Sequence, residues 1–183
     1  MKEKLEKLIL DTVMSWSEND IYAISLFVCD DNDNPCKPTV TLGYNTELKV
    51  KQELPEAEDE NEARWNYAFW LQNEEFCFGT NETASDVRKW IEDKGFSYYE
   101  DDSPVWEDDA AYNEAEEITK AFISELTHIV ADIHKSEILT AKFGKEIPIL
   151  IHELEYYDEI AKQNIEANGE ELVKEFVRYC MEG

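Results

Sequence analysis

The spacing of apolar residues predicts an amphipathic helix at the N-terminus. Its opposite face carries Lys and Glu, so only one stripe is expected to be buried. That stripe contains Leu5, Leu8, Ile9, Thr12, Val13 and Trp16. Further along, Thr83 or Ser85 can cap a second helix that buries Val87 and Trp90 and stops before Gly95.

The second half of the chain shows the same helical spacing over longer stretches. A long helix is predicted from about Ala110, with Gly144 marking its approximate limit. One face of this helix collects Ile118, Phe122, Leu126, Ile129 and Ile133. Helical periodicity returns over Tyr156–Ala167, breaks at Asn168 and Gly169, and resumes in a last helix.

A β-hairpin is predicted between the first two helices. Residues Ile21–Val28 are apolar, β-branched or aromatic, which is typical of a strand. The polar stretch Asp30–Pro35 then predicts a turn, and Thr39–Tyr44 the returning strand.

Three further segments are expected to contribute to the sheet. Aromatic residues alternate through Arg64–Trp70, which predicts that this block enters the sheet, and Cys77–Gly79 is expected to close that unit. The apolar run Ile147–Ile151 is of strand type. Because the helices are grouped before and after the strands, we expect one α+β domain over residues 1–183, with a mainly antiparallel sheet packed against the N-terminal helix, the long helix and others.

The chain is strongly acidic. Its 43 Asp and Glu residues against 17 Lys and Arg give a net charge of −26 at pH 7. A field of this sign repels phosphate backbones and anionic membranes, so it argues against direct nucleic-acid binding and membrane association, and it favours a basic protein partner. The alternative is that the charge serves solubility alone.

The N-terminal residues and the apolar runs predict a cytoplasmic protein. The N-terminus has no apolar signal core, and no stretch approaches the roughly 20 apolar residues of a membrane span. The four cysteines, Cys29, Cys36, Cys77 and Cys180, lack the paired spacing of a zinc site and are interpreted as reduced core residues.

Two motifs begin like metal sites but fail at defined positions. Asp30–Asn34 alternates carboxylates and amides as a calcium loop does, yet Pro35 stands where an EF-hand requires Gly and Thr41 where it requires Glu. His152–Tyr156 starts like a zinc-protease helix but has Tyr156 in place of the second histidine. The sequence also has no Gly-rich phosphate loop and no nucleophile motif, so no cofactor and no catalytic residue is predicted from these patterns.

One helical motif keeps a metal-dependent enzyme open as an alternative. Glu125 and His128 have the spacing that places two ligands on one helical face in di-iron bundles, and Asp132 lies one turn further. Such a bundle needs two copies of the motif, and the chain has one. A solvated helix face is the simpler interpretation.

The segment from Phe96 to Glu117 carries nine acidic residues and no Lys or Arg. Rigid aromatic side chains beside carboxylates suit a desolvated contact with Lys and Arg. The candidate partner-binding residues are Tyr98, Tyr99, Asp101, Asp102, Trp106, Asp108 and Asp109. The alternative is that Trp106 is a core residue and the acids form a solvated loop.

Three stretches give a resemblance to a known family: Asp20–Ser25, Gly43–Thr46 and Glu62–Trp70. They resemble an uncharacterised bacterial family of small cytosolic α+β proteins, for which no activity or catalytic residues are established. More loosely, the charge resembles that of small acidic proteins that protect bacteria from toxins. The resulting hypothesis is a non-catalytic, immunity-like binding protein, and a carboxylate mimic of nucleic acid is a further alternative.

Overall fold

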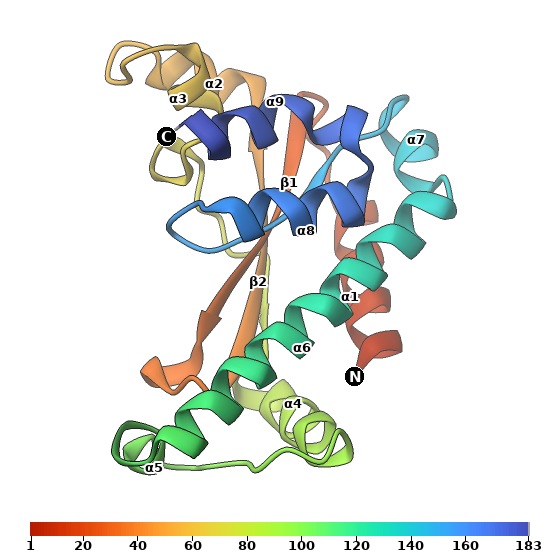
Figure 1. Cartoon of the computed structure of the whole chain (residues 1–183). Helices are drawn as coiled ribbons and strands as arrows, with labels where there is room; N and C mark the ends of the chain where they lie inside the picture. Colours follow the sequence, from red (N-terminus) through yellow and green to blue (C-terminus); the bar gives the residue numbers. More distant parts are fainter. Residues whose placement is uncertain (183) are drawn as a thin grey trace.

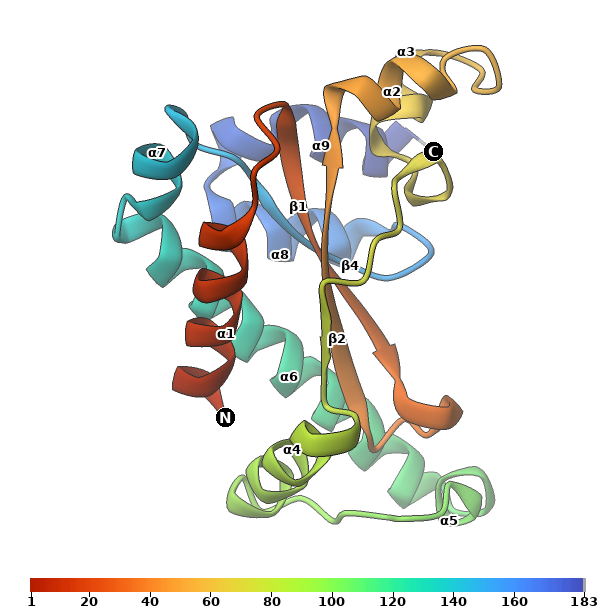
Figure 2. The ribbon, with the colours of Figure 1, turned by 180° about the vertical axis from the view of Figure 1, so that it is seen from behind.

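The computed structural model describes residues 1–182, in which helices lie on both sides of one four-stranded sheet (Figures 1 and 2). The predicted α+β class, with an N-terminal helix (α1) and a long helix (α6), is confirmed. The elements in chain order are α1 (Lys2–Ser15), β1 (Ile21–Asp30), η1 (Asp31–Asp33), β2 (Pro38–Thr46), α2 (Glu47–Glu53), α3 (Glu60–Trp65), η2 (Tyr67–Phe69), β3 (Phe76–Phe78), α4 (Asn81–Asp93), α5 (Ser103–Glu107), α6 (Asp109–Lys135), α7 (Ile138–Phe143), β4 (Ile149–His152), α8 (Asp158–Asn168) and α9 (Glu170–Glu182).

The sheet has the strand order β3-β2-β1-β4. Strand β2 pairs antiparallel with both β1 and β3, and Val28 lies opposite Val40, so the predicted hairpin is confirmed. Strand β4 pairs parallel with β1, with Leu26 opposite Ile151. The sheet is therefore mixed, with antiparallel pairing in two of its three strand contacts.

Each face of the sheet packs against its own helices. Because side chains alternate along a strand, Leu26 and Leu42 point to one face, where they join a core with α1, α4 and α6. On the other face Ala23 and Leu150 join a core with α8 and α9. Helix α6 runs diagonally past the β4 edge and contacts α1 as well as α8 (Figures 1 and 2).

The outer edge of β4 is bound by two asparagines of α8 in place of a further strand. Asn164 accepts from the Ile151 amide at 2.9 Å and donates to the Ile151 carbonyl at 2.7 Å. One turn later, Asn168 makes the same pair of bonds to Ile149, at 2.8 and 3.0 Å. A carboxamide supplies one donor and one acceptor, as a strand residue does, so these two side chains satisfy an edge that is otherwise open to further pairing.

The Arg64–Trp70 block does not enter the sheet, so that prediction was wrong. Asp59 accepts from the Glu62 amide and caps α3, and Asn66 accepts from the Ala68 amide and caps η2. Capping of this kind favours helical turns over a ladder. Trp65 and Trp70 are buried against Tyr22 instead. The strand that completes the sheet is β3.

The long helix also ends earlier than Gly144. Helix α6 stops at Lys135, where Ser136 Oγ bonds the Ile133 carbonyl at 2.6 Å and Glu137 adopts a left-handed φ of 57°. Gly144 caps the separate short helix α7. The side chain of Ser136 therefore ends α6 two turns before the glycine.

Cysteine burial follows the alternation of the strands. Cys36 and Cys180 are buried, as expected, but Cys29 is exposed and Cys77 is half-buried. Cys29 follows Val28, which faces the core, so its own side chain points to the opposite side of the sheet. None of the helices in residues 1–182 combines the length and hydropathy that crossing a membrane requires.

The clamp on β4 is testable by replacing one asparagine. Asn164→Ala removes the side-chain partner of the buried Ile151 amide and leaves the Ile151 carbonyl only its bond from Gln163, so we expect the free energy of unfolding to fall by about 3 kcal/mol. Urea denaturation measures this loss, and the Ile151 amide should exchange with solvent faster. The control Asn113→Ala, at an exposed position of α6, should change stability by less than about 0.5 kcal/mol. Equal effects of the two variants would contradict the clamp.

Candidate functional site

The acidic segment forms α5 and the start of α6, and it leaves two large aromatic side chains exposed. Trp106 is 59% exposed and Tyr112 43% exposed, with ring centroids 6.1 Å apart. Helix α5 is little more than one turn long and buries Val105, so its neighbour Trp106 faces away from the core. Trp106 is therefore not a core residue.

Two of the predicted acids hold this corner in place. Asp102 Oδ2 accepts from the Trp106 indole nitrogen at 2.8 Å. Asp108 caps α6 by accepting from the Ala110 amide at 2.8 Å. Asp109, the exposed first residue of α6, suits the positive end of the helix dipole. These carboxylates have local structural roles beside any part in attracting a partner.

The remaining predicted residues, Tyr98, Tyr99 and Asp101, do not line a groove with Trp106. The Tyr98 ring is covered by the Arg88 guanidinium at 4.8 Å and by the Lys37 ammonium at 5.7 Å. The Tyr99 carbonyl accepts from the Asn34 side chain at 3.1 Å. Asp101 accepts from Ser103. The predicted residues are thus not brought together in one place, and Tyr98 already has cationic partners within the chain.

Trp106 and Tyr112 instead line a groove between α6 and the segment that leads into α8, with a volume of about 550 Å³. Figure 1 shows α6 and α8 close together at the C-terminal end of α6 and further apart towards α5. We call this space the wedge groove. Besides Trp106, it is lined by Tyr112, Ala115, Glu116, Thr119, Lys120 and Ile123 of α6, by Glu153, Tyr157, Glu159 and Gln163 opposite, and by Asp30 and Pro35.

A second hollow of about 450 Å³ adjoins the wedge groove and shares Asp30, Glu153 and Tyr157 with it. This hollow adds Leu154, which is 72% exposed, and Tyr157 is 41% exposed. Exposed apolar side chains gathered around a concave surface and rimmed by polar ones mark an interaction site. Four such side chains, those of Trp106, Tyr112, Leu154 and Tyr157, surround the joined hollows.

The groove is strongly acidic. Burial, together with the charges of Glu153 and Asp33, raises the pKa of Asp30 to about 6. Burial and Glu153 also raise the pKa of Tyr157, whose hydroxyl donates to Glu153 at 3.0 Å. Lys120 is paired with Glu117 at 2.8 Å. Glu159 lies 3.9 Å from Lys162, whereas Asp30 and Glu153 take part in none of the ion pairs formed within residues 1–182. Carboxylates held without a cation in a partly dry hollow attract a cationic group.

Sequence reasoning did not identify the far wall of this groove. The sequence indicates Asp30 only as a turn residue at the start of an incomplete calcium loop, and Glu153 only as part of an incomplete zinc motif. A usable signal was present, because an isolated Leu154 between Glu153 and Glu155 follows a buried strand. His152 is the last residue of β4, so it does not lie on a helix as the first histidine of a zinc-protease motif would.

The three residues of the metal hypothesis each have other contacts. Glu125 lies 3.4 Å from Lys94, and Asp132 pairs with Lys2 at 2.8 Å. His128 Nδ1 contacts the Ser124 carbonyl at 2.7 Å. In the described part of the chain no three His, Cys, Asp or Glu side chains are grouped as metal ligands are.

Ser25 and His152 have the spacing of a nucleophile and its base, with Oγ and Nε2 at 2.8 Å. Ser25 is 4% exposed and His152 is 0% exposed, so no substrate reaches them in the folded protein. Burial lowers the pKa of His152 to about 4. The pair therefore forms a neutral hydrogen bond in the core, where Tyr67 and Trp70 pack around the imidazole.

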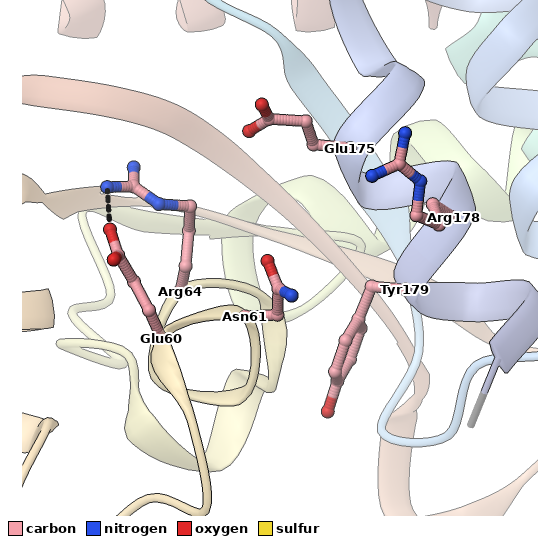
Figure 3. A pocket seen from close by; sticks show the side chains of 6 residues that line it. All are labelled: Glu60, Asn61, Arg64, Glu175, Arg178 and Tyr179. Atoms are coloured by element: carbon pink, nitrogen blue, oxygen red, sulfur yellow. Dashed lines mark ion pairs between the residues drawn. The ribbon is translucent and has the colours of Figure 1, made fainter.

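A smaller pocket of about 300 Å³ lies between α3 and α9 (Figure 3). It is lined by Glu60, Asn61, Arg64, Glu175, Arg178 and Tyr179. The Arg64 guanidinium is neutralised by Glu47, with nitrogen–oxygen distances of 3.0 and 2.8 Å, and by Glu60 at 3.6 Å. Across the pocket, Glu175 and Arg178 extend together from α9. Paired and mixed charges give this pocket no clear preference for an anion or a cation.

Comparison with protein-family models, with curated proteins and with solved structures gives no match for this chain. The wedge groove is the candidate site because it combines exposed aromatic side chains with the unpaired carboxylates of Asp30 and Glu153.

The cost of Asp30 to stability can be measured. In the folded state the Asp30 carboxyl has a pKa of about 6, whereas the pKa of an aspartate in an unfolded chain is about 4. The folded state thus binds more protons between these values, and stability falls as pH rises through this window. We expect Asp30→Asn to stabilise the protein at pH 7 by about 1 kcal/mol, and the gain to vanish as pH falls towards 4.

Urea unfolding at pH 7, 5 and 4 gives this comparison. The control Glu56→Gln removes the same charge at an exposed position and should be neutral at each pH. A loss of stability in Asp30→Asn at pH 7 would show that the carboxylate is favourably placed, contrary to this description.

Proposed function

We propose that the chain is a protein-binding module that engages a basic partner through the wedge groove, and that it acts by binding rather than by catalysis. One observation carries this proposal: the exposed Trp106 and Tyr112 line a groove whose opposite wall presents Tyr157, and two of its carboxylates, those of Asp30 and Glu153, have no ion-pair partner among the described residues. Inhibition of a basic toxin by an immunity protein is one form of such a function.

The two kinds of side chain in the groove support different aspects of binding. Large aromatics that become desolvated in a complex hold it together, and their loss appears mainly in dissociation. Rim carboxylates such as Glu116 and Glu159 raise the association rate, and salt screens them. A basic partner with an apolar centre satisfies both features.

No observation on the described residues favours the alternatives to the same degree. A mimic of nucleic acid would present carboxylates in a phosphate-like array, whereas the groove interleaves its acids with apolar side chains. A metal-dependent enzyme built on Glu125, His128 and Asp132 would need these residues released from their present contacts. Both remain predictions.

The proposal is tested by affinity capture with matched variants. The tagged protein is used as bait in an extract of the source cells at low and high salt, beside Trp106→Ala/Tyr157→Ala and the control Leu48→Ala/Met181→Ala. The control residues are exposed but lie on α2 and α9. We expect wild type and control to retain the same basic protein at low salt and the groove variant to lose it.

Association and dissociation rates, measured with the captured protein, then distinguish the role of the aromatic side chains from that of the carboxylates. Trp106→Ala should speed dissociation about 30-fold, as for a hot spot worth about 2 kcal/mol. Glu116→Gln/Glu159→Gln should slow association at low salt only. Because Trp106 is largely exposed, Trp106→Ala should change the free energy of unfolding by less than about 0.5 kcal/mol. Capture of the same proteins by all three baits, or of no basic protein, would refute the proposed function.

A further inference from the structure

The shape of the wedge groove indicates what kind of segment fits it. Its α6 wall is a single stripe of residues spaced three or four apart, from Tyr112 to Ile123. At 1.5 Å per residue this stripe is about 16 Å long, which corresponds to three helical turns. The groove can therefore receive a helix of about this length along α6.

The negative charge of the groove favours an occupant with positive charge. A second copy of this chain would bring another −26 charges to an acidic groove, so self-association there is opposed by repulsion. The groove carries Asp30, Glu116, Glu153 and Glu159, and its own Lys120 is paired with Glu117. A segment with Lys or Arg on one side and apolar residues on the other complements this surface.

The outer edge of β4 is closed to an extended occupant. Strand addition needs an open sheet edge, and the outer edge of β4 is taken up by Asn164 and Asn168. The walls of the groove are formed by side chains of α6 and of the start of α8. Grooves walled in this way bind amphipathic helices through anchors spaced three, four and seven residues apart.

We propose that the wedge groove receives a basic amphipathic helix of about three turns from the partner. Its apolar face lies against Trp106, Tyr112 and Tyr157, and a Lys or Arg side chain reaches Asp30 and Glu153. This inference rests on the proposed function and adds the conformation of the bound segment and its dependence on pH.

The dependence on pH follows from the groups that face Asp30. The titratable groups that line the two hollows with Asp30 are Cys29 on β1, Asp33 in the turn after β1, Glu153, Glu155 and Tyr157 after β4, Glu116 and Lys120 on α6, and Glu159 on α8. The pKa of Asp30 is raised to about 6 by burial, Glu153 and Asp33. A bound cation favours the ionised form, so the complex releases a proton below this pH and binding weakens as pH falls from 7 to 5.

The test uses synthetic peptides of about 12 residues containing only Lys and Leu. In the first, Leu recurs at helical spacing. The second has the same composition with strict Lys–Leu alternation, the third has the helical pattern interrupted by Pro, and in the fourth Glu replaces Lys. Binding is followed by calorimetry and by the NMR resonance of the Trp106 indole N–H, which is assigned with Trp106→Phe.

We expect the helical Lys–Leu peptide to bind and to shift the Trp106 resonance, and the other three to bind at least about tenfold more weakly. Asp30→Asn/Glu153→Gln should weaken binding about tenfold, while the charge-matched control Glu56→Gln/Glu58→Gln should change it less than twofold. Lowering the pH from 7 to 5 should weaken binding to wild type more than to Asp30→Asn.

Each other outcome contradicts the inference. Equal binding of the helical and alternating peptides would show that the bound segment need not be helical. Equal effects of the groove and control variants would show that Asp30 and Glu153 do not contact the bound segment. If the helical peptide fails to bind while capture of a basic protein still depends on Trp106, the helix is wrong and the proposed function stands. If neither depends on the groove, both are wrong.

Discussion

The hydrogen bonds from Asn164 and Asn168 to the outer edge of β4 determine the arrangement of the site. They fix the C-terminal half of α8 against the sheet. His134 Nε2 contacts the same Asn168 oxygen at 3.0 Å, which brings the end of α6 to that point. The two helices are thus held together at one end and separate towards the other, where α5 and the segment before α8 line the open part of the groove (Figure 1). The two asparagines that take the place of a neighbouring strand therefore also set how far α6 and α8 diverge along the groove.

Most elements were predictable because they depend on local periodicity. The buried stripe of α1 and the paired runs of β1 and β2 follow from spacings of about 3.6 and of two residues. The Trp65 block failed because two short-range caps, Asp59 and Asn66, outweighed an alternation of aromatic residues. The parallel pairing of β4 with β1 was not predictable, since residues 24 and 149 meet only through tertiary packing.

The sequence predicted only one side of the candidate site, the side that carries Trp106. Trp106 stood out as an aromatic residue among acids, and the structure leaves it exposed. The other half depends on Asp30 and Glu153, which come together from β1 and from the segment after β4. No local sequence pattern indicates that two residues so far apart in the chain lie close together in the fold. The charge of −26 did indicate the sign of the surface, but it could not indicate where acids remain unpaired.

The distribution of the ion pairs explains why the groove keeps its negative charge. Many lysines pair with an acid one turn away on their own helix, as Lys89 does with Asp93 and Lys120 with Glu117. Such exposed pairs contribute little stability, and each of these lysines already has an acid beside it on its own helix. Asp30 consequently lies beside other carboxylates in a partly dry site. Meanwhile Asp102 holds the Trp106 indole through a hydrogen bond before any partner arrives. Restricting an exposed aromatic in this way lowers the conformational entropy lost on binding. The acidic segment therefore orders the aromatic side chain that the proposed basic partner would contact.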